Sequence, residues 1–417
     1  MKKRLQIMLC LLACGFLFPH TALAEEISNY ELMQEIRAMK QKIEHMEKQL
    51  EQKDMEIEEI KSGKDPGASD GAAVKWLDRI TFSGAVELDY GYADDRDTGD
   101  NRVSDSTSDM DIGTVELGAE IALHEYVTGN VLFKAENLDA DDNVFCDEAT
   151  ITLGKEGFPL YFVGGKRAQP FGVFESHLIS DPLTQDLYEI ADTGATFGFA
   201  PGVYGMDISA TLYRGEVLMT RMLEGAYGLD RTYLDDTGAL PGWREGGMDA
   251  RYDESDGVSS FIGNITMEPM EGMAAAIFYD SEPGDGKRNT TLGGMFHFEI
   301  SGFTLDAEYI TALGREEDAI TGKEHKESAL VGSVAYYVTD DLEVAARYET
   351  FEDDIQGDQD SHLDYRYALG CTYTLFKTED FSASLMGEYR KSRFERQEGS
   401  PTDDGLNEFF ARLAIEF

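Results

Sequence analysis

From Trp76 to Phe417 the chain consists of short segments in which apolar residues recur at every second position. This alternation is typical of β-strands that have one apolar and one polar face. The connections between the segments are alternately short and long, as in a membrane barrel, whereas a soluble sandwich has no reason to alternate them. We therefore expect sixteen strands, over residues 79–93, 112–123, 127–138, 146–154, 160–167, 193–199, 203–214, 258–268, 272–280, 290–300, 302–312, 327–338, 341–351, 363–376, 381–391 and 406–417.

The last segment, LNEFFARLAIEF (406–417), has an apolar face that ends on Phe417 and a largely polar face that carries Arg412. In lipid every backbone polar group must be paired, so the sheet must close and the last strand is expected to pair with the first. Phe417 would then lie in the periplasmic aromatic girdle. A terminal Phe after an alternating strand also resembles the targeting signal of outer-membrane barrels. Taken alone, this strand fits the edge of a soluble sandwich equally well.

The alternation also assigns the two faces of the first strand. Its lipid face is predicted to carry Phe82, Gly84, Val86, Leu88, Tyr90 and Tyr92. Charges on a lipid face cost ~2–4 kcal/mol at mid-bilayer. The central charges of most strands, such as Glu87 and Asp89 in the first, fall on the opposite face, which is expected to line the lumen.

The N-terminus has the pattern of a secretory signal peptide, residues 1–24. Three basic residues precede an apolar stretch, and Ala22-Leu23-Ala24 offers a cleavage site before Glu25. A lipoprotein signal ending at Cys14 is the alternative. No stretch of 18 or more apolar residues predicts a membrane-spanning helix.

Residues 25–61 are predicted to form a short periplasmic α-helical coiled coil, because apolar residues recur there at heptad spacing. The seam, through which the chain is expected to oligomerise, includes Ile36, Met39, Ile43, Met46, Leu50 and Ile57. A single solvated helix is the alternative. Isoleucine at these positions leaves dimer and trimer open, and the barrel that follows favours a homotrimer. Residues 62–78 are expected to be a linker. The predicted fold is thus all-β: a 16-stranded antiparallel transmembrane β-barrel over residues 79–417, preceded by this coiled coil.

The third long connection, residues 168–192, is expected to fold into the barrel and narrow the pore, as the third outer loop does in sixteen-stranded porins. It mixes apolar and acidic residues, and an apolar loop exposed to water would be a liability. An external cap is the alternative. The residues expected at the constriction are Phe171, Phe174, Glu175, His177, Asp181, Asp186 and Glu189.

The pore wall opposite this loop is predicted to be basic. One arginine falls on the lumen face of each of the last four strands: Arg347, Arg366, Arg390 and Arg412. An acidic loop that faces these arginines would create a transverse field at the narrowest point. The alternative is that these arginines form salt bridges with carboxylates on the same faces, and both arrangements can hold at once.

The chain is acidic, with a formal net charge of −45, and several predicted outer loops carry runs of Asp and Glu. Such oxygen ligands suit divalent cations, but none has EF-hand spacing. We expect no cofactor and no protein-bound metal site; weak Ca²⁺ binding by these loops, or bridging to lipopolysaccharide through divalent ions, is the alternative to plain solvation. The sequence lacks HExxH, GxSxG and P-loop motifs, so an enzyme is not expected.

The stretch ITLGKEGFPLYFVGGKRAQPFGVFESHLISDPLTQDLYEIADTGATFGF (151–199) resembles the siderophore porins of the legiobactin-receptor type, the LbtU family. A looser likeness extends over residues 27–417. The resemblance implies an outer-membrane porin that passes ferric siderophores without an energised receptor's plug domain. Its expected partners are outer-membrane lipid, lipopolysaccharide and a ferric siderophore or other small solute; no nucleic acid is expected.

The acidity of the lumen conflicts with one part of this resemblance. A carboxylate siderophore is anionic and should be repelled by an acidic lumen. We expect a porin for passive passage of small solutes, ferric siderophores first, through a barrel narrowed by the third loop. The alternatives are a general cation-preferring porin and a barrel that anchors a periplasmic stalk.

Overall fold

The computed structural model describes residues 79–95, 106–136, 144–219, 221, 257–284, 286–317, 324, 326–352, 363–378, 380–394 and 405–417. The predicted signal peptide, coiled coil and linker up to residue 78 lie outside these ranges, as do most of the acidic outer loops. In the described part of the chain, no helix is both long and apolar enough to cross a membrane.

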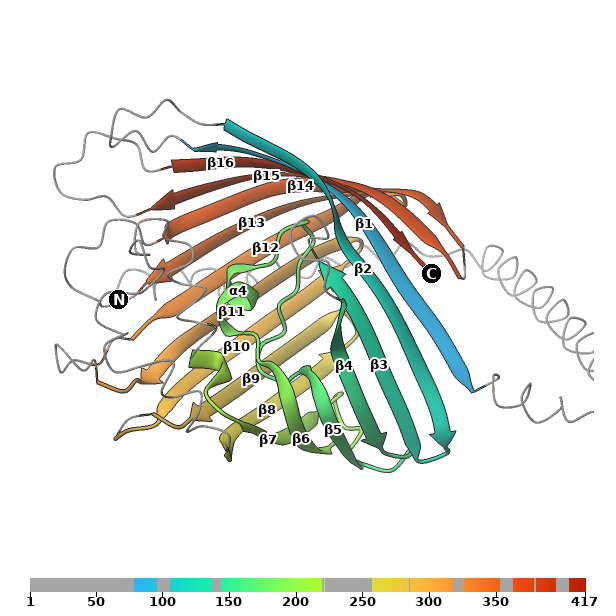
Figure 1. Cartoon of the computed structure of the whole chain (residues 1–417), viewed down its shortest axis with the longest axis vertical. Helices are drawn as coiled ribbons and strands as arrows, with labels where there is room; N and C mark the ends of the chain where they lie inside the picture. Colours follow the sequence, from blue (N-terminus) through green and yellow to red (C-terminus); the bar gives the residue numbers. More distant parts are fainter. Residues whose placement is uncertain are drawn as a thin grey trace, which may run out of the picture. The chain divides into compact units, whose positions relative to one another are not determined.

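Sixteen antiparallel strands close into one barrel, in which each strand pairs with its neighbours in sequence and the last pairs with the first (Figure 1). The predicted fold class is confirmed. The strands are β1 (Ile80–Asp95), β2 (Ser106–His124), β3 (Val127–Glu136), β4 (Val144–Leu153), β5 (Leu160–Ala168), β6 (Ala191–Phe199), β7 (Asp207–Arg214), β8 (Val258–Met270), β9 (Met273–Glu282), β10 (Asn289–Ile300), β11 (Phe303–Gly314), β12 (Ser328–Thr339), β13 (Leu342–Glu352), β14 (Leu363–Lys377), β15 (Ser382–Phe394) and β16 (Gly405–Glu416). A short helix, α4 (Leu183–Tyr188), lies in the connection between β5 and β6.

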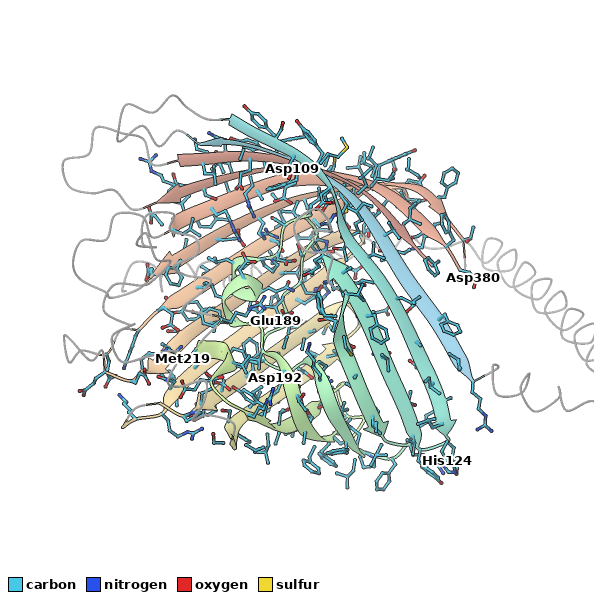
Figure 2. All side chains as sticks on the ribbon, viewed as in Figure 1. Asp109, His124, Glu189, Asp192, Met219 and Asp380 are labelled. Atoms are coloured by element: carbon cyan, nitrogen blue, oxygen red, sulfur yellow. The ribbon has the colours of Figure 1, made fainter. Side chains whose placement is uncertain are left out.

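The connections alternate between short turns at one end of the barrel and longer segments at the other. His124 and Asp380, beside two short turns, lie at one end, and Met219 lies toward the other (Figure 2). Two predicted strand starts are wrong by more than two residues: β2 begins at Ser106 rather than at residue 112, and β7 begins at Asp207 rather than at residue 203. Gly202, Tyr204 and Gly205 have φ values of 71°, 53° and 57°, and left-handed backbone of this kind cannot continue a strand.

Alternation along the strands separates an apolar outer face from a polar lumen. On β1, Phe82 is 60% exposed and Leu88 43% exposed, as expected of side chains that contact lipid. On β13, the neighbouring Arg347 and Glu349 are buried on the opposite face. Exposed aromatic side chains gather near the short turns and match the interfacial girdle of a membrane barrel: Tyr126, Phe158, Tyr204, Tyr336, Tyr337, Phe381 and Phe417. Cys146 and Cys371 are both free.

The barrel is closed by backbone pairing between its two ends. The N–H of Gly84 donates to the carbonyl of Phe417 at 2.9 Å, and the N–H of Phe417 donates to the carbonyl of Gly84 at 3.0 Å. The Phe417 ring lies over the glycine. A Cβ added to Gly84 would lie 2.6 Å from that ring and 2.9 Å from the carbonyl oxygen of Glu116.

Replacing Gly84 by alanine is expected to destabilise the barrel at this seam by about 1–3 kcal/mol, because the added methyl group has no room. Gly91→Ala on the same strand is the matched control, since its Cβ would lie 3.9 Å from the nearest heavy atom, in Phe410. Urea unfolding in detergent, followed by heat-modifiable gel migration, measures the difference. Equal midpoints for the two variants would contradict the tight contact with Phe417.

Candidate pore constriction

The connection between β5 and β6, residues 169–190, lies inside the ring of strands (Figure 1), and we call it the constriction loop. Its two ends are joined, because the N–H of Gln169 donates to the carbonyl of Ile190 at 2.7 Å. The Gln169 side chain also donates to the carbonyl of Asp192 at 2.6 Å. Left-handed backbone at Gly172 (φ 85°) and Phe174 (φ 57°) then turns the chain along the inner wall.

An apolar core holds the constriction loop against one side of the lumen. Leu183, Leu187 and Ile190 are fully buried, and the Phe171 ring packs edge-on against Phe278 of β9 with 5.0 Å between centroids. The wall contributes apolar side chains at positions that alternation assigns to the lumen: Tyr213, Ile262, Phe278, Ile310, Val331 and Phe351. Leu363 of β14 joins them after a register shift between Leu363 and Tyr365. Burial of this surface on both sides favours a docked loop.

The tip of the loop packs into a hollow lined by small residues. Leu178 forms a buried apolar cluster with Ala335, Ala345 and Ala368. A Cβ added to Gly370 of β14 would lie 2.5 Å from the Leu178 side chain. The wall therefore has small side chains at the place where the loop tip approaches it most closely.

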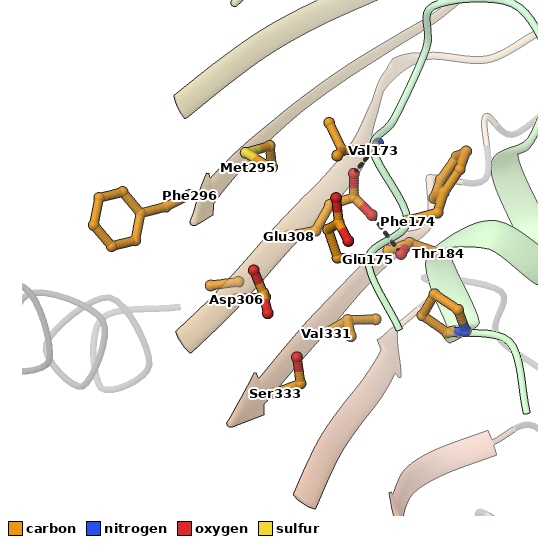
Figure 3. A pocket seen from close by; sticks show the side chains of 12 residues that line it. Val173, Phe174, Glu175, Thr184, Met295, Phe296, Asp306, Glu308, Val331 and Ser333 are labelled. Carbon is orange, nitrogen blue, oxygen red and sulfur yellow. Dashed lines mark hydrogen bonds between the residues drawn. The ribbon is translucent and has the colours of Figure 1, made fainter. Parts of the chain in front are cut away.

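Buried carboxylates of the wall bind the loop backbone. Glu308 of β11 accepts hydrogen bonds from the Val173 N–H at 2.8 Å and from the Thr184 hydroxyl at 2.6 Å (Figure 3). Glu349 accepts from the Leu183 N–H at 2.7 Å. In this way the free N–H groups of an irregular loop are satisfied by carboxylates inside the barrel.

Arg347 is an anchor of the loop and not part of an opposite wall. Its guanidinium donates to the Ser180 carbonyl at 2.8 Å, the Ser180 hydroxyl at 2.7 Å and the Asp181 carbonyl at 2.9 Å. It also donates to the Ser176 hydroxyl at 3.1 Å and is only 2% exposed. The loop lies directly on this arginine, whereas the sequence led us to expect the two to face each other across the pore.

Arg366 differs from the expectation in the same way. It is 2% exposed, forms a close ion pair with Glu349 and lies 3.3 Å from a carboxylate oxygen of Asp186 in the loop. Burial raises the pKa of Asp186 above its ordinary range, and Arg366 opposes this rise. A buried guanidinium is stable only with such partners, so the charge of Arg366 is neutralised behind the loop.

The other two predicted arginines remain on the open side of the lumen but are paired along the wall. Arg390 binds Glu408 through two hydrogen bonds of 2.7 and 2.9 Å. Arg412 binds Asp89 of β1 through two bonds of 2.7 Å and lies 2.9 Å from Glu87. The salt-bridged alternative thus describes all four arginines, although the side chains of Arg390 and Arg412 stay 18% and 20% exposed.

The exposed residues of the loop tip are Glu175, Ser176 and Asp181. Asp181 is close enough to Arg412 for the two charges to interact. Apart from its root at Gln169, the loop's described hydrogen bonds and buried packing are with the chain from β7 to β15, and we therefore expect the passage to lie along the remaining strands. The structure therefore brings an acidic edge of the loop near Arg412, which stays paired with Asp89 and Glu87.

The other predicted constriction residues hold the loop in place. Phe171 is fully buried. The Phe174 side chain, together with Met295 and Ser333 of the wall, lines a small cavity between the loop and the wall (Figure 3). Glu189 lies 3.2 Å from Arg221 of the next outer connection.

His177 is held between two carboxylates of the wall. Its Nε2 lies 3.0 Å from Asp306 of β11, and its Nδ1 lies 3.1 Å from Glu343 of β13. A neutral imidazole has one N–H and could donate to one of them only, so this geometry favours the imidazolium form. Hydrogen bonds to Asp306 and Glu343 raise the pKa of His177 to about 9.

The pKa of His177 rises from 6.5, so its ion pairs stabilise the docked loop fully below pH 6.5 and are lost as the pH rises through about 9. We expect open-channel current noise to increase between pH 7 and pH 10, because the loop tip is released. In His177→Gln the noise should be high already at neutral pH and nearly constant with pH. His297→Gln is the control, since His297 binds Asp306 but not the loop. Equal pH dependence in wild type and His177→Gln would show that the ion pairs of His177 do not hold the loop tip.

Two basic side chains, Lys134 and Arg167, lie on the strands away from the loop tip. Lys134 of β3 lies within 3.5 Å of Glu116 and 2.8 Å of Glu136. The described hydrogen bond of Arg167 goes to the Thr196 hydroxyl at 3.1 Å. Within the ranges that the structure describes, no group of three or more His, Cys, Asp or Glu side chains is arranged to hold a metal ion. The acidic outer loops, for which weak Ca²⁺ binding is the alternative to plain solvation, lie mostly outside these ranges.

Several residues that matter here were not expected from the sequence. Glu308, Glu349 and Glu388 bind the loop backbone from the wall. A signal for them exists: apolar residues such as Ile310 and Phe351 occupy lumen positions beside these carboxylates. An apolar lumen position in a water-filled barrel indicates that another segment covers it.

Comparison with known proteins agrees with this geometry. The profile of the Gram-negative porin family matches residues 67–396. This chain belongs to the Gram-negative porin family. The protein is therefore an outer-membrane porin by family, and its closed barrel agrees with that assignment.

A curated relative of this porin is a UPF0422 protein of Coxiella burnetii, which is 25% identical over 253 residues. The match covers 58% of this chain and 49% of the relative. The porin thus spans about half the length of that relative, whose printed name gives no activity.

Solved porin structures share the fold. An anion-selective porin from Comamonas acidovorans has a TM-score of 0.55 at 10% identity, covering 81% of this chain and 99% of that one. Salmonella typhi OmpF, in complex with daunomycin, has a TM-score of 0.54 at 11% identity, covering 81% and 97%. Pseudomonas putida OprB has 0.52 at 9% identity, covering 83% and 96%. At such identities the likeness concerns the barrel and says nothing of the solute.

Proposed function

We propose that this porin is a passive, cation-preferring diffusion channel for small hydrophilic solutes, narrowed by the constriction loop. The observation that carries the proposal is the docked loop, which presents Glu175 and Asp181 to the passage. The four lumen-face arginines of β13–β16 are paired with carboxylates, so they add little net positive charge. A passage lined by uncompensated carboxylates concentrates cations and repels anions.

Ferric siderophores are the second solute class that we propose. The guanidinium groups of Arg390 and Arg412 remain partly exposed at the constriction, and the resemblance of residues 151–199 to siderophore porins points to the same cargo. These two arginines could bind oxygen atoms of a ferric chelate locally. A neutral or cationic chelate would pass more readily than a polycarboxylate chelate.

The experiment is a liposome-swelling assay with the purified barrel and solutes of graded size and charge. We expect swelling to be faster with neutral sugars and small amines than with anions of equal size. Ferric siderophores of different charge are then added to a planar bilayer that contains the channel. Block by a ferric siderophore but not by its iron-free form supports the second class. An impermeable barrel would overturn the channel and favour an anchor for a periplasmic stalk.

We also propose that the barrel assembles as a homotrimer in lipid and lipopolysaccharide. One structural neighbour, OmpT of Vibrio cholerae, is described in a trimer form, with a TM-score of 0.50 at 10% identity. The heptad of residues 25–61 would support such an assembly. Chemical cross-linking in native outer membranes should yield trimers, and a variant without residues 25–61 shows whether that segment contributes.

A further inference from the structure

Arg288 lies outside the lumen, at the end of the barrel opposite the short turns. It directly precedes β10, and its side chain is exposed. Its Nε donates to the Ser281 hydroxyl at 2.7 Å, and Ser281 of β9 pairs in register with Phe261 of β8, which is 37% exposed on the lipid face. Cross-strand partners share one face of a sheet, so the Arg288 side chain lies on the lipid face. Short turns face the periplasm, which places Arg288 at the level of the outer leaflet.

Three hydrogen bonds fix the Arg288 guanidinium without neutralising its charge. Besides the Ser281 hydroxyl, it binds the carbonyls of Ser281 and Ser259 through Nη2, at 2.6 and 2.9 Å. All three acceptors are uncharged, and no carboxylate of the described residues forms an ion pair with Arg288. The neighbouring Lys287, in contrast, forms an ion pair with Glu324. Nη1 of Arg288 takes no part in these bonds, so it can donate to an anion outside the barrel.

A second guanidinium lies beside the first. Arg214 ends β7 on the lipid face, where it pairs in register with Val258 of β8, and its side chain is 56% exposed. Its Nε lies 3.5 Å from Asp192, so a carboxylate opposes part of this charge. Arg288 reaches β8 at Ser259, the residue after Val258, and neighbouring strands are about 5 Å apart. The two arginines can therefore contact one headgroup.

An apolar surface continues from the two arginines toward the middle of the membrane. Leu212 pairs with Phe261, and further along the same strands Ile208 pairs with Ile265. These four side chains are 37–48% exposed, and Val258 between the arginines is 71% exposed. A ligand that fits this part of the wall has an anionic group at the membrane boundary and hydrocarbon chains next to it.

We propose that Arg214 and Arg288 bind the phosphate groups of lipopolysaccharide, whose acyl chains lie against the apolar surface of β7 and β8. Guanidinium groups bind phosphate through paired, charge-assisted hydrogen bonds. The chain has a formal net charge of −45, which repels free anions, whereas acyl chains hold a lipid-borne phosphate at this depth. The inference rests on the proposed lipopolysaccharide environment and does not depend on what the pore conducts.

The test measures binding of bisphosphorylated lipid A, the membrane anchor of lipopolysaccharide, to the detergent-solubilised full chain by native mass spectrometry. We expect bound lipid A, and weaker binding of the same lipid after its phosphates have been removed. In the double variant Arg214→Gln, Arg288→Gln the dissociation constant for bisphosphorylated lipid A should rise about tenfold or more, because charge-assisted bonds to phosphate are lost. Heat-modifiable gel migration shows that the variant barrel is folded.

The matched control is the double variant Lys155→Gln, Lys377→Gln, which removes two positive charges at the other end of the barrel. Lys155 lies in the short turn between β4 and β5, and Lys377 ends β14 beside another short turn; both are exposed. The dissociation constant for lipid A should stay at the wild-type value in this control.

Equal binding of lipid A to wild type and to the arginine double variant would overturn the site, as would equal binding of phosphorylated and dephosphorylated lipid A. Displacement of lipid A by an equal concentration of inorganic phosphate would assign the arginines to the free anion and overturn the glycolipid site. Stronger binding of phosphatidylglycerol than of lipid A would overturn it in favour of a phospholipid. A conducting channel without lipid A binding refutes this site alone, whereas a barrel that binds lipid A through the arginines but carries no current supports the site and refutes the proposed channel.

Discussion

Arg347→Ala is expected to release the tip of the constriction loop while leaving the barrel closed. The guanidinium makes four hydrogen bonds to Ser176, Ser180 and Asp181, and the variant removes all four of them. Loss of a buried, charged anchor of this kind costs about 3–5 kcal/mol. The docked loop should therefore exchange with undocked states, which will appear as current noise, sub-conductance levels and closure at lower voltage.

Arg390→Ala is the matched control for this prediction. Arg390 is also a lumen arginine in a carboxylate pair, but its described contacts are with Glu408 and the Phe410 ring, both on the wall. Single-channel recording of the two variants at equal voltage compares them directly. A quiet Arg347→Ala channel, indistinguishable from Arg390→Ala, would show that the apolar core alone fixes the loop.

Reversal of the two exposed loop carboxylates, Glu175→Lys with Asp181→Lys, is expected to change ion selectivity. These side chains face the narrowest part of the passage, whereas Asp186 lies behind it against Arg366. With four units of charge added at the constriction, the permeability ratio of cation to anion should fall by about tenfold. The conductance at high salt should change much less, because salt screens the electric field of the loop charges and leaves the width of the passage unchanged.

Glu416→Lys separates local from general electrostatics in this experiment. Glu416 is an exposed residue at the short-turn end of β16, and its described side-chain partner is Ser382. Its reversal should shift selectivity only slightly. If Glu416→Lys shifts the ratio as much as the loop variant does, the selectivity of the pore is set by its overall charge and not by the constriction loop.

The barrel could be predicted from the sequence because lipid constrains every second residue of every strand. The alternation of apolar and polar residues, together with the alternation of short and long connections, predicted the number of strands and the closure of the barrel through Phe417. The start of β7 could not be predicted. The turn before it extends through Tyr204, whose backbone is left-handed, and a tyrosine in the sequence does not indicate that conformation. A non-glycine residue with positive φ is set by its surroundings.

The side of the lumen on which the constriction loop docks was beyond sequence reasoning. Arg347 and Ser180 are far apart in the chain, and no local period links them. Period two placed the four arginines on the lumen face but could not show that the loop covers two of them. That outcome follows from the apolar lumen positions of β8–β13, which need a covering segment, and from Gly370, which makes room for Leu178.

The measurement that tests the account most directly is the zero-current potential of single channels in a potassium chloride gradient at neutral pH. A docked loop that exposes Glu175 and Asp181, with the wall arginines paired, predicts a potential of the sign expected when potassium passes more readily than chloride. A potential of the opposite sign, or none at all, would contradict the cation-preferring constriction.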